Sequence, residues 1–158
     1  MTQQDVLFQT EDDLETEETA AEVQTEKYLL FLSHGLLFGV PAEAVVEIIT
    51  GHTVTKLPLV PDYLRGIINL RGQIIPIIDI RRFLHHPDQK SDCMIILQAG
   101  GDQVGILVDE VQKMVDVELS TIVSSPAQNA GELVSGMCTL EDGQTMLAFD
   151  CGCLLNHV

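Results

Sequence analysis

The segment at residues 64–84, LRGIINLRGQIIPIIDIRRFL, constrains the fold more than any other part of the chain. Two runs of branched aliphatic residues, 67–70 and 74–78, flank the sequence Asn-Leu-Arg-Gly at 69–72. Asn favours the first position of a type I turn and Gly the last, so the segment predicts a β-hairpin. Side chains alternate between the two faces of a strand, yet aliphatic residues occupy both faces here. One face can fill a core, and the other must be covered by a second structural layer or by another protein.

The residues around this hairpin favour a docking surface over a reaction centre. Pro76 has no amide hydrogen to give to a sheet ladder, which places its strand at an edge or a bulge. Arg71 lies at the turn, where it can form a bidentate pair with a carboxylate of a partner protein. The alternative is that Arg71 ties down a local carbonyl group or Asp79. Arg81 and Arg82 are expected to be surface charges on a helical turn.

Charge is distributed unevenly along the chain. The 158 residues carry a formal net charge of −16, and residues 1–26 hold nine acidic residues and no Lys or Arg. Residues 56–82 reverse the sign, with five basic residues against two acidic ones. Phosphate groups repel such an acidic chain, which argues against general binding of nucleic acid and against an anionic membrane surface.

Residues 1–26 are predicted to be a disordered acidic tail, because their few apolar residues are scattered singly. The alternative is that the tail folds loosely over the basic window at 56–82 and weakens the binding of partners. The start of the chain lacks the basic and apolar regions of a signal peptide, and no apolar run reaches the roughly 20 residues that span a membrane. The four cysteines show no disulfide pattern, so we expect a reduced, soluble, cytoplasmic protein with no membrane insertion.

Beyond the tail, short apolar runs alternate with turn sequences, which favours an all-β fold of barrels or a sandwich, with short helices. A helical turn is expected after Pro41, and a second unit is expected to begin near residue 92. The sequences at 38–49 and 104–115 resemble each other weakly, which fits either two similar small units or chance. Further strands are expected in hairpins at 28–40, 93–108 and 136–149 and in a short segment at 54–57.

The densest group of reactive side chains is Cys151, Cys153 and His157. It lacks the two close ligand pairs typical of structural zinc, and no cysteine lies in the electropositive surroundings that lower a thiol pKa. The chain also lacks a G-x-S-x-G nucleophile motif and the glycine-rich loops that bind phosphate. We therefore expect no catalysis, no metal and no cofactor. A thiol-dependent or metal-dependent enzyme that uses this group of side chains is the alternative.

The run LPLVPDYLRGIINLRGQIIPIIDIRRFL at 57–84 resembles the signature of CheW-type chemotaxis coupling proteins. Those proteins carry a proline-rich bend, a turn of the form G-[VI]-[IT]-N-L-R-G, and a strand that ends in V-P-[IV]-[IV]-D-L-R. The segments at 28–49, 104–115 and 136–155 are also similar to the family, so the resemblance covers about residues 27–155. The chain departs from the family in its longer acidic tail and in FDCGCLLN, which replaces a commonly basic closing helix.

The resemblance implies a CheW-like domain at 27–158, made of two small five-stranded β-barrel subdomains with a hydrophobic seam between them. The barrels are expected at about 27–91 and 92–150, and a C-terminal segment at 151–158. The implied function is a non-catalytic adaptor that couples the cytoplasmic tips of methyl-accepting chemoreceptors to the histidine kinase CheA, with the kinase face mainly on the second barrel. A scaffold for a different signalling receptor is the alternative. The implied partner-binding residues are Val45, Glu47, Gly66, Asn69, Arg71, Gly72 and Cys93.

Overall fold

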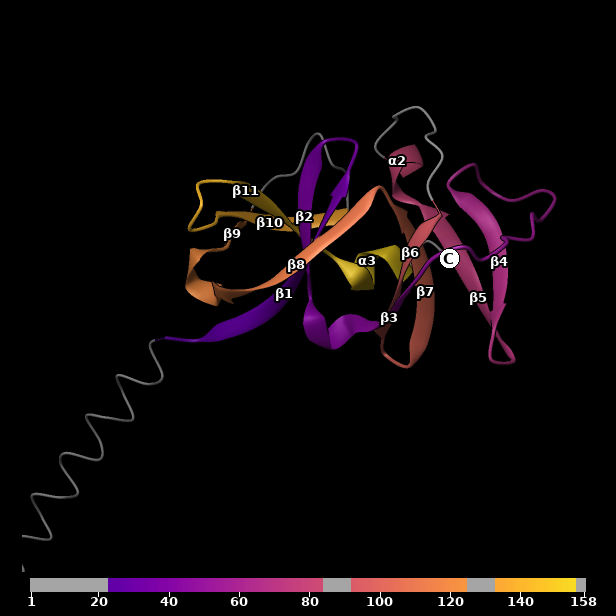
Figure 1. The fold of residues 1–158 in the computed structure, drawn as a ribbon, viewed down its shortest axis with the longest axis horizontal. Coiled ribbons are helices and arrows are strands. Elements are labelled where there is room, and N and C mark those ends of the chain that lie inside the picture. Colours follow the sequence, from indigo (N-terminus) through magenta and orange to yellow (C-terminus); the bar gives the residue numbers. More distant parts are fainter. Residues whose placement is uncertain (1–22, 84–91, 125–132, 156–158) are drawn as a thin grey trace, which may run out of the picture.

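The computed structural model describes residues 23–83, 92–124 and 133–155, and most of these residues lie in β-strands. The strands form two sheets, with the short helix α3 between them (Figure 1). The strand order is β8-β1-β2-β11-β10-β9 in the six-stranded sheet and β3-β6-β7-β5-β4 in the five-stranded sheet. This confirms the all-β class with short helices. No helix in the described ranges is long and apolar enough to cross a membrane.

The bounds of the elements are as follows. The six-stranded sheet contains β1 (Thr25–Ser33), β2 (Leu36–Pro41), β8 (Glu110–Glu118), β9 (Val123–Ser124), β10 (Val134–Thr139) and β11 (Thr145–Phe149). The five-stranded sheet contains β3 (Val45–Ile49), β4 (Leu64–Leu70), β5 (Gln73–Asp79), β6 (Cys93–Ala99) and β7 (Asp102–Val108). The short helical segments are η1 (Ala42–Ala44), α2 (Ile80–Phe83), η2 (Leu119–Thr121) and α3 (Cys151–Leu155).

The two sheets are interleaved along the chain. After β2 the chain crosses through η1 into the five-stranded sheet, and it returns to the six-stranded sheet at Asp109, the single residue between β7 and β8. The expected boundary at residue 91 therefore does not divide one sheet from the other. Strands β1 and β2 lie before it but pair with β8 and β11, which lie after it. One sheet has the expected five strands, and the other has six because it includes the two-residue strand β9.

The expected hairpins at 28–40, 64–78, 93–108 and 136–149 are all present. The expected strand at 54–57 is reduced to one bridge, in which Thr55 and Ile67 exchange backbone hydrogen bonds of 2.8 and 2.9 Å. β5 pairs with β7 from Ile77 onward, so Pro76 lies just before that ladder begins and interrupts none of its hydrogen bonds. This part of β5 is in effect an edge, as the proline predicts.

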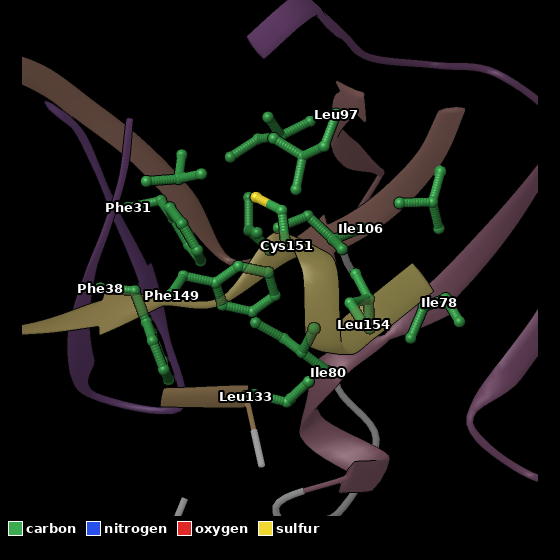
Figure 2. Close-up of a cluster of buried hydrophobic side chains, with 14 of the residues drawn as sticks. Phe31, Phe38, Ile78, Ile80, Leu97, Ile106, Leu133, Phe149, Cys151 and Leu154 are labelled. Atoms are coloured by element: carbon green, nitrogen blue, oxygen red, sulfur yellow. The ribbon is translucent and has the colours of Figure 1, made fainter. Parts of the chain in front are cut away.

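Both faces of the central strands are buried, in three separate apolar clusters. In β1, Leu29 and Phe31 belong to a cluster shared by the two sheets. The alternate residues Tyr28 and Leu30 belong to a cluster inside the six-stranded sheet. A third cluster lies inside the five-stranded sheet. We call the shared cluster the seam core; Figure 2 shows its members Phe31, Phe38, Ile78, Leu97, Ile106, Phe149, Cys151 and Leu154. The expected hydrophobic seam is confirmed.

Candidate partner-binding surface

The turn between β4 and β5 is centred one residue later than expected. Leu70 pairs with Gln73, so the turn contains only Arg71 and Gly72, and both have positive φ angles, of 53° and 84°. Positive φ at both central residues is typical of a type I′ turn, which suits the twist of a two-residue hairpin. The type I turn expected over 69–72 is therefore wrong. The Asn69 side chain still shapes the turn, because its Oδ1 accepts the Gly72 N–H at 2.9 Å.

Arg71 forms a bidentate ion pair with Glu47 of β3. Its Nη1 pairs with Oε1, and its Nη2 donates to Oε2 at 3.2 Å. The hydrogen bonds and the charge of Glu47 raise the pKa of Arg71. Glu47 and the β4–β5 hairpin lie at opposite edges of the five-stranded sheet, so the pair joins those edges across a curled sheet. The Arg71 side chain nevertheless remains 74% exposed.

The aliphatic face beside this turn is only partly covered. Ile78 and Ile74 lie on the same face of β5, since their positions differ by four residues. Ile78 is buried in the seam core, whereas Ile74, near the turn, is 56% exposed. On β3 the neighbours of Glu47, Val46 and Ile48, are also exposed. We define the hairpin surface as Glu47, Asn69, Arg71, Gly72 and Ile74. The first four were implied as partner-binding residues by the sequence resemblance, and Ile74 is added because its side chain is exposed in the structure.

Three other predicted site residues lie elsewhere. Gly66 is buried, with φ of +144°, and a Cβ there would overlap the backbone carbonyl of Thr55. Its role is therefore to let two backbone segments approach each other. Val45 is half-buried against the seam core. Cys93 begins β6 and is half-buried, and burial and the neighbouring Asp92 raise its pKa.

Arg81 was expected on the surface, and this expectation is wrong. Its side chain is fully buried and paired with Asp79 and Asp109, at 3.0 and 3.2 Å. Arg65 also lies 3.6 Å from Asp79. Asp79 is thus occupied by other arginines, which removes it as a partner of Arg71. The spacing Asp-x-Arg at 79–81 was the available signal, since it places a carboxylate at the end of a strand only two residues before a guanidinium that can pair with it.

The positive charge counted over residues 56–82 is largely compensated in the fold, because Arg65, Arg71 and Arg81 each pair with a carboxylate. A free basic patch for the acidic tail is correspondingly smaller than the sequence indicates. Residues 1–22 of the tail lie outside the described residues, so their predicted disorder stays a prediction. The expected end of the tail at residue 26 is wrong, because Thr25 and Glu26 begin β1.

The position of Cys151 gives little support to the alternative function, a thiol-dependent enzyme. Cys151 begins α3 and points into the seam core, near Phe149 and Leu154 (Figure 2). Burial raises the pKa of its thiol to about 11, so the thiol stays protonated at neutral pH. The Cys153 side chain and His157 lie outside the described part of the chain. Across the described ranges, no three His, Cys, Asp or Glu side chains are grouped as metal ligands.

We predict that Cys151 resists alkylation in the folded protein. A shift from the usual 9.0 to about 11 lowers the thiolate fraction at pH 8 by about a hundredfold, and burial adds a steric barrier. Iodoacetamide labelling at pH 8 followed by mass spectrometry should find Cys151 labelled only after urea is added. Rapid labelling of Cys151 in the native protein would revive a thiol function.

The comparisons with known proteins agree with this architecture. Residues 27–158 match the family model of the CheW-like domain. The chemotaxis protein CheW of Bacillus subtilis is 36% identical over 110 residues, which cover 67% of this chain and 70% of that protein. The chemotaxis protein CheW of Klebsiella aerogenes is 31% identical over 134 residues, covering 81% and 80%. The crystal structure of the scaffolding protein TtCheW from Thermoanaerobacter tengcongensis superimposes with a TM-score of 0.74 at 26% identity, covering 80% of this chain and 90% of that one.

Proposed function

This chain belongs to the CheW-like domain family, and we propose that it acts as a non-catalytic adaptor between chemoreceptors and the histidine kinase CheA in a chemotaxis or related motility array. The hairpin surface is the observation that carries the proposal. It presents an exposed guanidinium, held in place by Glu47, next to an uncovered aliphatic side chain. Because the ion pair already orients Arg71, a partner loses less side-chain entropy when it binds there.

We assign the hairpin surface to the helical tip of the receptor. An amphipathic helix can lay its apolar stripe on an exposed aliphatic side chain, and Ile74 is 56% exposed. Arg71 can at the same time pair with an acidic residue of that helix, since a guanidinium has five N–H donors and Glu47 uses only part of them.

The kinase needs a second surface, and the six-stranded sheet offers one. Phe38, Leu147, Met137 and Val123 are successive neighbours across its ladders and so share one face. The exposed fraction rises along this row from 0% at Phe38 to 38% at Met137 and 65% at Val123. The apolar face of the sheet thus continues beyond the seam core to an open edge at β9. We assign this open edge, Met137 and Val123, to the regulatory domain of the kinase.

Exchanging the charges of the ion pair separates a partner contact from an internal one. Arg71→Glu and Glu47→Arg should each weaken binding of a receptor cytoplasmic fragment about tenfold or more, as loss of an interface arginine does. The melting temperature should not change, because an exposed pair contributes little to stability. The double variant Arg71→Glu/Glu47→Arg restores an internal pair of reversed polarity, and we expect it to remain defective. Titration calorimetry would measure all three, with Lys27→Glu in the six-stranded sheet as the control. Full recovery in the double variant would contradict a partner contact by Arg71.

A further inference from the structure

A buried ionic cluster joins the two sheets at the point where the chain passes from one to the other. We define it as Asp79, Arg81 and Asp109. In α2, the Arg81 side chain donates from Nε and Nη2 to the two carboxylate oxygens of Asp79, at 3.0 and 3.2 Å. Its remaining terminal nitrogen, Nη1, donates to Oδ1 of Asp109 at 3.2 Å. Arg81 and Asp79 are both fully buried.

Asp109 makes contacts with both sheets. Its Oδ1 accepts from Arg81, which follows β5 of the five-stranded sheet. Its Oδ2 accepts the backbone N–H of His34, in the β1–β2 turn of the six-stranded sheet, at 2.7 Å. The N–H of Asp109 itself donates to the Leu32 carbonyl at 2.9 Å. One side chain at a one-residue crossover therefore connects an element of each sheet.

These contacts constrain geometry in a way that the seam core does not. Apolar packing is non-directional, so the seam core sets no hydrogen-bond distances or angles between the two sheets. Charge-assisted hydrogen bonds have preferred distances and angles, and the guanidinium is a rigid planar group. Asp79 pairs with Leu107 of β7, so Arg81 meets Asp109 at the end of the five-stranded sheet and holds its carboxylate there. The second oxygen of that carboxylate can then accept the His34 N–H only when the β1–β2 turn of the other sheet lies in one position.

We infer that Arg81, acting through Asp109, is a positioning residue that fixes the angle between the two sheets. The hairpin surface belongs to one sheet and the open edge at Met137 and Val123 to the other. The cluster therefore sets how a receptor on the first surface is placed relative to a kinase on the second. This consequence for signalling rests on the proposed adaptor function, whereas the effect on sheet orientation does not.

The variant Asp109→Asn tests whether the ionic cluster fixes the angle between the two sheets. An amide offers one acceptor oxygen in place of two and brings an N–H group toward existing donors, so the link between the sheets weakens while the Asp79–Arg81 pair stays. We expect exchange of the His34 amide hydrogen to become about tenfold faster or more. Amides of the β6–β7 ladder should keep their wild-type rates, and residual dipolar couplings should require separate alignment tensors for the two sheets. The control is Asp116→Asn, which makes the same change at an exposed position on β8 and should alter neither readout.

Equal acceleration of all amides, or one alignment tensor that fits both sheets, would overturn the inference and leave the cluster a role in stability alone. Arg81→Lys is the second variant, because an ammonium group keeps the charge but cannot span both aspartates. It should loosen the sheets in the same way. If both variants unfold, the positioning role is likewise overturned.

The consequence of sheet orientation for signalling is tested with a receptor cytoplasmic fragment and the kinase regulatory domain. Asp109→Asn should bind each partner separately within about threefold of wild type, because both surfaces are intact. Receptor control of the full-length kinase should fall about tenfold or more. Unchanged control despite loosened sheets would overturn the signalling consequence. If the wild-type chain binds neither partner, the proposed function fails, and the dipolar couplings still decide the structural part.

Discussion

Replacing Arg81 with methionine is expected to lower the free energy of unfolding by about 3 kcal/mol, near the lower end of the range for breaking a buried ion pair. The loss arises because Asp79 stays fully buried after its bidentate partner is removed. The value falls at the lower end because Arg65 remains 3.6 Å from Asp79 and can compensate part of the charge. Asp109, whose side chain is 23% exposed, can regain contact with water.

Urea unfolding followed by circular dichroism would measure this change, provided that the m-value stays constant. Lys27→Met is the matched control. It removes a cation from an exposed ion pair with Asp116, and it should cost no more than about 1 kcal/mol. A similar small loss for both variants would show that the ionic cluster is well hydrated in solution and contributes little to the fold.

The second large effect is expected at Gly66, where substitution by alanine should destabilise the protein by about 2–4 kcal/mol. Gly66 has φ of +144°, a conformation that residues with a Cβ rarely adopt. A Cβ would also overlap the Thr55 carbonyl, a backbone atom that cannot rotate away. The bridge between Thr55 and Ile67 would have to open to make room.

Gly72→Ala separates these two causes. Gly72 also has positive φ, of +84°, but no atom lies within 4 Å of the place that its Cβ would take. Its substitution should cost about 1 kcal/mol, from backbone strain alone. Equal losses at the two positions would mean that the close approach of Thr55 contributes nothing. If Gly66→Ala keeps full stability but loses a partner, then the expected role of Gly66 as a contact residue would be right.

The fold could be inferred from sequence largely because the turn and strand signals are local. Asn-Leu-Arg-Gly between aliphatic runs indicates a hairpin whatever surrounds it, and Pro76 indicates the edge-like part of its strand. The pairing of β2 with β11, by contrast, joins residues more than a hundred positions apart. Nothing in either strand encodes that pairing, so the boundary expected at residue 91 did not follow the sheets.

The same division between local and long-range signals holds for the candidate site. The position of Arg71 at an exposed turn could be inferred, because it follows from the hairpin. Its pairing with Glu47 depends on how far the sheet curls, which strand patterns do not report. Arg81 was misplaced for a related reason: composition favours an exposed arginine, and only the crossover at Asp109 supplies the second carboxylate that makes its burial possible.

Assembly of three purified components shows whether this chain joins the receptor to the kinase. The kinase regulatory domain is immobilised, a receptor cytoplasmic fragment is added, and retention of the receptor is measured with and without this chain. We predict retention only when the chain is present. Arg71→Ala should remain bound to the kinase while losing the receptor. The adaptor role would fail if the folded wild-type chain retains no receptor on the kinase, and the role of Arg71 would fail if Arg71→Ala retains as much receptor as wild type.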